Sequence, residues 1–138
     1  MTFWKTIKTI KDKTTGVVHF KRFCYFSCGW FGIYKHIITQ ADKEKHEHDH
    51  PWDFWSLIVE GCYAEFVDHK MYARNLFSIQ YNKAEYHHKL AGVIGTNNRC
   101  VTIVVTRRRK RKWGYVTKDG WIENSIYRKL KGQNKLPD

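Results

Sequence analysis

The chain has 138 residues, enough for one domain with a single hydrophobic core. Hydrophobic residues make up 42% and aromatic residues 16%, which is too rich for a disordered chain, and 9 Gly with 2 Pro exclude collagen-like and low-complexity classes. The 25 Lys and Arg outnumber the 13 Asp and Glu, and the net charge of +12 favours an anionic partner such as nucleic acid, a nucleotide or a phosphorylated metabolite.

Short segments rich in β-branched and aromatic residues follow one another along the chain and are separated by turn residues. The first 15 residues are rich in Lys and Thr and predict either a loose basic arm or an edge strand. Strands are predicted, in chain order, over residues 17–26, 32–39, 52–59, 62–67, 76–81, 100–106, 113–116 and 121–123. Tight turns at 60–61 and 117–120 would join two pairs of these strands, because each turn contains a glycine that can adopt positive φ.

One short helix is predicted over residues 125–131, with Asn124 as its N-cap and Gly132 at its end. Six to nine short strands with regular turns and a single helix are typical of an all-β sandwich or barrel. The chain therefore divides into three predicted parts: a basic arm or edge strand over 1–15, a β-barrel over 16–124, and a C-terminal helix and tail over 125–138.

Histidines concentrate in one segment near the middle of the chain. His46, His48 and His50 would point to the same side of an extended segment, because side chains alternate between the two faces of a strand. Neutral imidazole is a common protein ligand of Zn, Fe, Ni and Cu. Two such histidines, with a third from a neighbouring strand, would make a three-cornered metal site with open positions. We therefore predict a metal site here rather than a solvated, histidine-rich loop.

Residues 46–50 also match H-E-x-x-H, the zinc-protease motif, which needs a helix to bring its two histidines onto one face. Pro51 follows the second of these histidines and disfavours helical geometry at His50. The segments on both sides have the pattern of strands. The helical interpretation is therefore much less favoured than an extended one.

Two motifs of the chain resemble those of the small single-domain cupins found in bacteria and phages. The first is HDHPWDF at residues 48–54, and the second is AEYHHKL at residues 84–90. The C-terminal segment 106–121 also resembles the last strand pair of these proteins. The resemblance covers about residues 30–125, and its first motif is the most specific part.

This resemblance implies a jelly-roll β-barrel, open at one end, which holds a divalent metal ion (Fe, Mn, Ni or Zn) on inward-facing histidines. His48 and His50 match the paired ligands of the first cupin motif, and His88 matches the single ligand of the second. Two residues stand in reserve as further ligands. His46 shares the predicted strand face of the pair, and Asp53 follows the pair at a shorter interval than the glutamate that cupins usually carry.

Six consecutive cations, RRRKRK, occupy residues 107–112. If they extend the preceding strand, Arg107, Arg109 and Arg111 share one face and can line the barrel mouth, where guanidinium groups bind phosphate well. The equally weighted alternative is a solvated edge that discourages strand pairing. Trp52 is predicted to be pocket wall, and Tyr86 stands where related chains often carry another histidine, so both join the predicted ligand-binding residues.

Three functions are compatible with these features. The leading one is a metal-dependent enzyme, such as a dioxygenase, isomerase or hydrolase, that acts on a small anionic ligand. The second is a non-catalytic cupin that sequesters a nucleotide signal, as a viral counter-defence protein would. The third and least favoured is a basic nucleic-acid accessory protein. Jelly-roll barrels often pair through edge strands, so a homodimer is an expectation from the fold alone.

Nothing in the chain predicts a membrane or secreted location. No apolar run approaches the roughly 18 residues of a transmembrane helix, and the first 16 residues lack the apolar core and cleavage site of a secretory signal. We expect a cytoplasmic protein (host cytoplasm if it is viral) with no membrane partner. The four cysteines lack the spacing of a zinc module, and we expect reduced thiols at Cys24, Cys28, Cys62 and Cys100.

Overall fold

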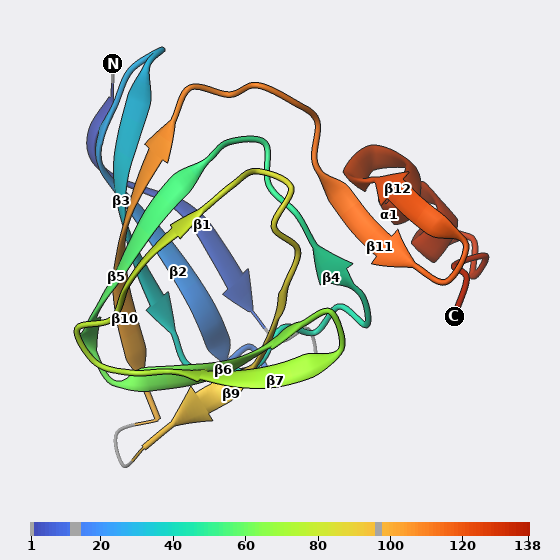
Figure 1. Ribbon diagram of the computed structural model, residues 1–138, viewed down its shortest axis with the longest axis horizontal. Coiled ribbons are helices and arrows are strands. Elements are labelled where there is room, and N and C mark those ends of the chain that lie inside the picture. Colours follow the sequence, from blue (N-terminus) through green and yellow to red (C-terminus); the bar gives the residue numbers. More distant parts are fainter. Residues whose placement is uncertain (1, 12–14, 96–97) are drawn as a thin grey trace.

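The structure, a computed structural model, describes residues 2–11, 15–95 and 98–138. Within these ranges the chain forms short antiparallel strands and one helix (Figure 1), so the predicted all-β fold with a short C-terminal helix is confirmed. The elements are β1 (Thr2–Lys11), β2 (Val18–Ser27), β3 (Phe31–Ile38), β4 (Glu47–His48), β5 (Phe54–Glu60), β6 (Cys62–Val67), β7 (Lys70–Arg74), β8 (Ile79–Asn82), β9 (Lys89–Ile94), β10 (Cys100–Arg107), β11 (Gly114–Thr117), β12 (Gly120–Glu123) and α1 (Asn124–Gly132).

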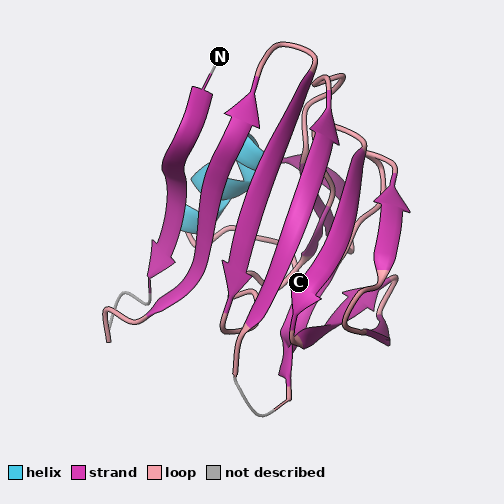
Figure 2. Cartoon of the chain, turned by 90° about the vertical axis from the view of Figure 1, so that its left-hand side faces the viewer, coloured by secondary structure: helices cyan, strands magenta, loops and turns pink. Residues whose placement is uncertain are grey.

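The strands form one large sheet and two small ones. The large sheet has six strands in the order β1-β2-β3-β10-β5-β8, and Figure 2 shows them side by side. The small sheets have the orders β12-β11-β4 and β7-β6-β9. In Figure 1 the large sheet lies on the left, β4 and β11 lie on the right, and β6, β7 and β9 run across the bottom. Residues of all three sheets line a cavity between them.

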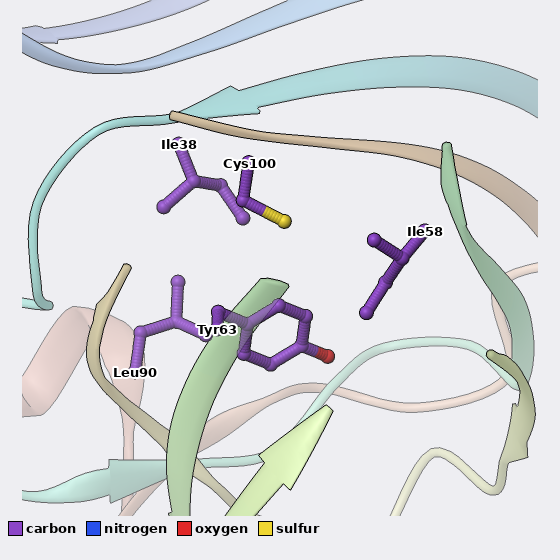
Figure 3. Close-up of a cluster of buried hydrophobic side chains, with 5 residues drawn as sticks. All are labelled: Ile38, Ile58, Tyr63, Leu90 and Cys100. Carbon is purple, nitrogen blue, oxygen red and sulfur yellow. The ribbon is translucent and has the colours of Figure 1, made fainter. Parts of the chain in front are cut away.

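A cluster of buried hydrophobic side chains joins the sheets (Figure 3). Ile38, Ile58 and Cys100 project from the large sheet and meet Tyr63 of β6 and Leu90 of β9. All five are at most 9% exposed. Burial of a large apolar side chain contributes about 1.5–3 kcal/mol, so this cluster holds the two layers together and forms the floor of the space between them.

The predicted strands are present with small shifts, but the number of strands exceeds the predicted six to nine. The predicted strand at 76–81 begins later, at Ile79, because Phe77 adopts a positive φ of 62° in the preceding turn. Strands β7 and β9 were not predicted. Most of β7 is exposed, and β9 is interrupted by Gly92, so neither carries a clear alternation of buried and exposed residues.

The C-terminal helix begins one residue earlier than predicted, and Asn124 is not its cap. Glu123 is the N-cap residue and makes no side-chain capping hydrogen bond, whereas the Asn124 side chain accepts a hydrogen bond from Arg128 Nε at 3.1 Å. The helix buries Tyr127, whose ring stacks on Tyr115 of β11 with 3.8 Å between ring centroids.

Within the described ranges no helix is long and apolar enough to span a bilayer. The four cysteines form no disulfide.

Candidate metal centre

A short backbone pairing places two histidines from distant parts of the chain side by side. His48 N donates to His88 O at 2.8 Å, and His88 N donates to His48 O at 2.9 Å. Residues directly opposite one another in an antiparallel pair have Cβ atoms about 4.5–5.5 Å apart, so the two imidazoles are neighbours. His50 lies two residues beyond His48, and its backbone N–H donates to Ala84 O at 2.9 Å. The local backbone therefore directs all three rings to one place.

The three imidazoles form a nearly equilateral group, called here the histidine triad. One ring nitrogen from each of His48, His50 and His88 lies within 4.8 Å of the others. The ring centroids are 5.2 Å apart for His48–His50, 4.9 Å for His48–His88 and 5.0 Å for His50–His88. Imidazole nitrogens bind zinc at about 2.0–2.1 Å, so nitrogens up to 4.8 Å apart would have to move closer together to share one ion. These are the three residues predicted as ligands.

Hydrogen bonds at Nδ1 orient the rings of His88 and His50. His88 Nδ1 lies 2.5 Å from Glu65 Oε2, and His50 Nδ1 lies 3.1 Å from the Tyr86 carbonyl oxygen. His48 Nδ1 lies 3.9 Å from a carboxylate oxygen of Asp42. When Nδ1–H donates to such an acceptor, Nε2 is left free to bind a metal ion. The surroundings of His50 and His88 therefore favour the tautomer that a metal site requires.

Glu65, which the sequence analysis missed, is the central residue of this supporting network. It is only 1% exposed, and its Oε1 accepts hydrogen bonds from Arg74 Nε at 2.6 Å and from the Tyr86 hydroxyl at 2.7 Å. Burial would raise the pKa of Glu65, but the hydrogen bonds from His88, Arg74 and Tyr86 outweigh it and hold that pKa at about 2. The available sequence signal was an acid on the inward face of a strand, two residues after Tyr63.

Burial keeps two of the triad histidines neutral. It lowers the pKa of His48 well below its ordinary value, and the nearby charges of His88 and Lys8 lower it further. Burial lowers the pKa of His50 in the same direction, again helped by His88. Only a neutral imidazole can bind a metal ion, so these two histidines are in the ligating form at neutral pH.

Neither reserve ligand joins the triad. The chain bends at His46, whose Nδ1 lies 2.9 Å from the Tyr127 hydroxyl beneath the C-terminal helix, so the predicted extended face covers only His48 and His50. Asp53 binds elsewhere: its Oδ1 accepts from Ala84 N and from Lys110 Nζ, both at 2.7 Å. The hydrogen bond from Lys110 lowers the pKa of Asp53. The chain is also extended at Glu47–His48, which excludes the helical zinc-protease interpretation.

The basic run divides into two parts instead of alternating along a strand. Strand β10 ends at Arg107, and the chain then turns, with Lys110 N and Arg111 N both donating to Pro51 O. Arg107, Arg108 and Arg109 line the cavity between the sheets. Arg111 does not: its guanidinium donates to Asp49 Oδ2 at 2.6 Å. The prediction of one shared face for residues 107, 109 and 111 is therefore wrong.

Arg111 is part of a buried structural network around Asp49. This aspartate is 4% exposed and also accepts hydrogen bonds from Gly114 N at 2.7 Å and from Trp121 Nε1 at 2.8 Å. The network ties the segment between His48 and His50 to β11 and β12. Asp49 and Arg111 therefore position the triad without facing it.

The triad faces a cavity of about 910 Å³ between the large sheet and the small ones. Trp52 and Tyr86 line this cavity, as do the three arginines of the basic run. On the opposite wall, the large sheet contributes Arg22, which the sequence analysis did not single out. A cavity of this size lies within the usual range for small-molecule sites.

No family model matches the sequence, and no curated protein sequence matches it. Solved structures do resemble the fold. A cupin-2 domain protein from Rhodospirillum rubrum superposes with a TM-score of 0.62 over 91% of this chain and 82% of that one, at 11% identity. The polyketide cyclase RemF from Streptomyces resistomycificus gives 0.63 over 98% and 94%, also at 11% identity. Fe(II) HppE gives 0.57 over 72% of this chain and 55% of that one, at 10% identity.

At these identities the likeness concerns the fold. The chain has the fold of the small cupins, and within that fold it carries a histidine triad that could hold a divalent metal ion.

Proposed function

We propose that this protein is a metal-binding cupin whose cavity binds, and with its metal acts on, a small anionic ligand such as a nucleotide or phosphorylated metabolite. The observation that carries the proposal is the convergence of three histidine nitrogens within 4.8 Å on the wall of the cavity. A set of neutral imidazoles suits Fe, Mn, Ni or Zn. The similar fold of a protein described as the Fe(II) form of HppE supports iron among these.

The residues around the triad have distinct roles in this proposal. His48, His50 and His88 would hold the ion, which would supply Lewis-acid chemistry or, if it is iron, oxygen activation. Glu65 keeps the His88 ring oriented through its hydrogen bond to Nδ1. The ring of Phe54 packs 4.6 Å from that of His50 and limits the access of water on that side.

The charge balance of the cavity supports an anionic ligand. Of the four carboxylates that line it, Glu65 and Asp49 are each paired with an arginine and Glu44 with Lys131, all outside the cavity lining, which leaves Asp42. The three arginines at the start of the basic run line the cavity and have exposed side chains. Paired carboxylates and available guanidinium groups together leave a positive field in the cavity, which attracts oxyanions.

Metal loading tests the metal part of the proposal. Protein purified without a histidine tag is analysed for metal content, stripped with a chelator, and titrated with Fe(II), Mn(II), Ni(II) and Zn(II). His88→Ala is compared with His87→Ala, a matched control because His87 is adjacent and outside the triad. We expect about one ion per chain in the wild type and in His87→Ala, and far less in His88→Ala. Wild-type protein that acquires none of these metals would contradict the proposal.

The alternative, a non-catalytic pocket for a nucleotide signal, makes a different prediction. It expects little metal under any condition and ligand binding that survives chelation. Mass spectrometry of small molecules that co-purify with the protein, before and after chelation, separates the two. Nucleic-acid binding would instead show an affinity for oligonucleotides that falls steeply with salt.

A further inference from the structure

A row of polar side chains crosses the inner face of the large sheet, on the wall opposite the triad. Strand pairing places Lys8 of β1 opposite Arg22 of β2, Arg22 opposite His36 of β3, and His36 opposite Thr102 of β10. All four residues line the cavity. Because side chains alternate between the faces of a strand, this row faces the cavity. Thr102 is buried, Arg22 and His36 are half-buried, and Lys8, on the edge strand, is exposed.

The two cations in the row have no carboxylate partner. Among the described residues, no carboxylate oxygen lies within ion-pair distance of Lys8 or Arg22. Asp42, a cavity carboxylate, accepts a hydrogen bond from Leu90 N at 2.9 Å instead. Like charges directly opposite one another on neighbouring strands destabilise a sheet. The positive charge of this row is therefore only partly compensated: Asp42 attracts Lys8 at longer range, and Arg22 has no carboxylate at ion-pair distance.

Two polar atoms of the row are also buried without a hydrogen-bond partner: Arg22 Nε and His36 Nε2. The large majority of buried side-chain polar atoms have a hydrogen-bond partner, in the protein or in ordered water. Both residues line the cavity, so the hydrogen-bonding capacity of this part of the row is not met within the protein.

The surroundings of Arg22 fix its guanidinium in place. The group lies 3.9 Å from the centroid of the Tyr34 ring and 5.4 Å from that of Trp52. A Cβ atom at Gly32 would lie only 2.5 Å from the Tyr34 ring, so the glycine leaves space for the ring that supports Arg22. The Trp52 ring in turn lies 6.1 Å from the ring of His50. Arg22 and the triad are thus linked through one aromatic side chain.

We propose that Arg22, together with Lys8 and His36, binds the phosphate or carboxylate group of the cavity ligand. This inference rests on the proposed function, which assigns an anionic ligand to the cavity, and it identifies the residues that recognise the anion. A guanidinium binds either oxyanion through two parallel hydrogen bonds. An oxyanion held at Arg22 leaves the rest of the ligand directed past Trp52 toward the triad.

The test measures binding of inorganic phosphate and of acetate to metal-free protein by isothermal titration calorimetry at constant ionic strength. Arg22→Gln is compared with Lys21→Gln, which loses the same charge at the adjacent position outside the cavity lining. We expect Arg22→Gln to weaken the preferred anion at least about tenfold, because charge-assisted hydrogen bonds are lost. Lys21→Gln should stay within about twofold of the wild type. The stronger of the two probes identifies the ligand group.

Equal weakening in Arg22→Gln and Lys21→Gln would overturn the inference, because it would show an effect of net charge alone. Absence of binding of both anions to the wild type would also overturn it. If circular dichroism shows that Arg22→Gln is unfolded, Arg22→Lys and Lys8→Gln replace it, and each should weaken the anion more than Lys21→Gln. Since all of these titrations use metal-free protein, a failure of metal loading contradicts the proposed function and leaves this result unaffected.

Discussion

The two walls of the cavity differ in how their polar groups are satisfied. On the triad wall, His88 contacts the ionised Glu65, which is in turn paired with Arg74. On the sheet wall, Arg22 and Lys8 lie opposite each other, and no described carboxylate lies within ion-pair distance of either. A carboxylate behind imidazoles suits a bound cation, whereas cations without an ion-pair partner suit a bound anion. The two walls of one cavity therefore suit ligands of opposite charge.

The largest loss of stability should come from a change on the triad wall, where the polar groups have hydrogen-bond partners. Glu65→Gln removes a buried charge that accepts hydrogen bonds from three side chains, and we expect it to lower the free energy of unfolding by about 3 kcal/mol. Metal affinity should fall about 10–100-fold, because the support of His88 is weakened. Urea unfolding and metal titration measure the two effects. Glu60→Gln, which disrupts an exposed pair with Arg99, is the control and should cost no more than about 1 kcal/mol. Equal losses in both variants would contradict the assignment.

A smaller difference in stability is expected between variants in the two parts of the basic run. Arg111→Gln removes one of the donors to buried Asp49, and we expect a loss of about 2 kcal/mol in the free energy of unfolding. Arg108→Gln, on an exposed side chain of the same run, should stay within about 0.5 kcal/mol of the wild type. Thermal and urea unfolding of both variants provide the measurement. If Arg111→Gln is as stable as Arg108→Gln, the Asp49 network does not hold the triad segment.

The pH dependence of stability should reveal buried histidines on both walls. Burial, with help from Arg22 and Lys8, lowers the pKa of His36 to about 3, and the pKa values of His48 and His50 are lowered in the same direction. The unfolded chain therefore takes up protons first. The stability of metal-free protein should fall as pH drops below about 6.5, by up to about 1.4 kcal/mol per pH unit for each such group.

The variant His36→Gln isolates the contribution of the sheet wall. Between pH 5 and 6.5, its dependence of unfolding free energy on pH should be shallower than that of the wild type by the equivalent of about one proton. The depressed pKa of Glu65 affects stability only at lower pH, below the ordinary glutamate pKa of about 4.5. Identical pH profiles for wild type and His36→Gln would show that His36 is not kept neutral by the fold.

The smallest expected effect has the opposite sign. Lys8→Gln removes one of two like charges that face each other, so we expect the metal-free protein to become more stable by up to about 0.5 kcal/mol. Lys5→Gln on the same strand is the control, because Lys5 lies opposite Cys24 and no cation. High-precision thermal unfolding at low ionic strength measures the difference. Loss of stability in Lys8→Gln would show that the attraction of Asp42 and the contact with the Phe20 ring outweigh the repulsion from Arg22.

Much of the fold could be predicted because its signals are local. Segments rich in β-branched and aromatic residues marked most strands of the large sheet, and the alternation of side chains along an extended segment placed His48 and His50 on one side. His88 was found through the resemblance of its motif to cupins and by no local pattern. Arg22 and Glu65 were missed because their importance depends on which residues lie across the barrel. Those neighbours are set by the pairing of distant strands, which no single segment of the sequence predicts. His46 and Arg111 were wrongly placed because strand geometry was extended past the points where the chain turns.

The pairing of His48 with His88 has a consequence for the order of events in folding. Two of the three predicted ligands meet only after a loop of on the order of 40 residues has closed, and such distant contacts form slowly. In a zinc finger the ligands are close in sequence, and the metal ion brings them together as the chain folds. In this chain the ligands are too far apart in sequence for an ion to do so before folding. An ion would bind once the barrel has formed, so its main effect would be to slow unfolding rather than to speed folding.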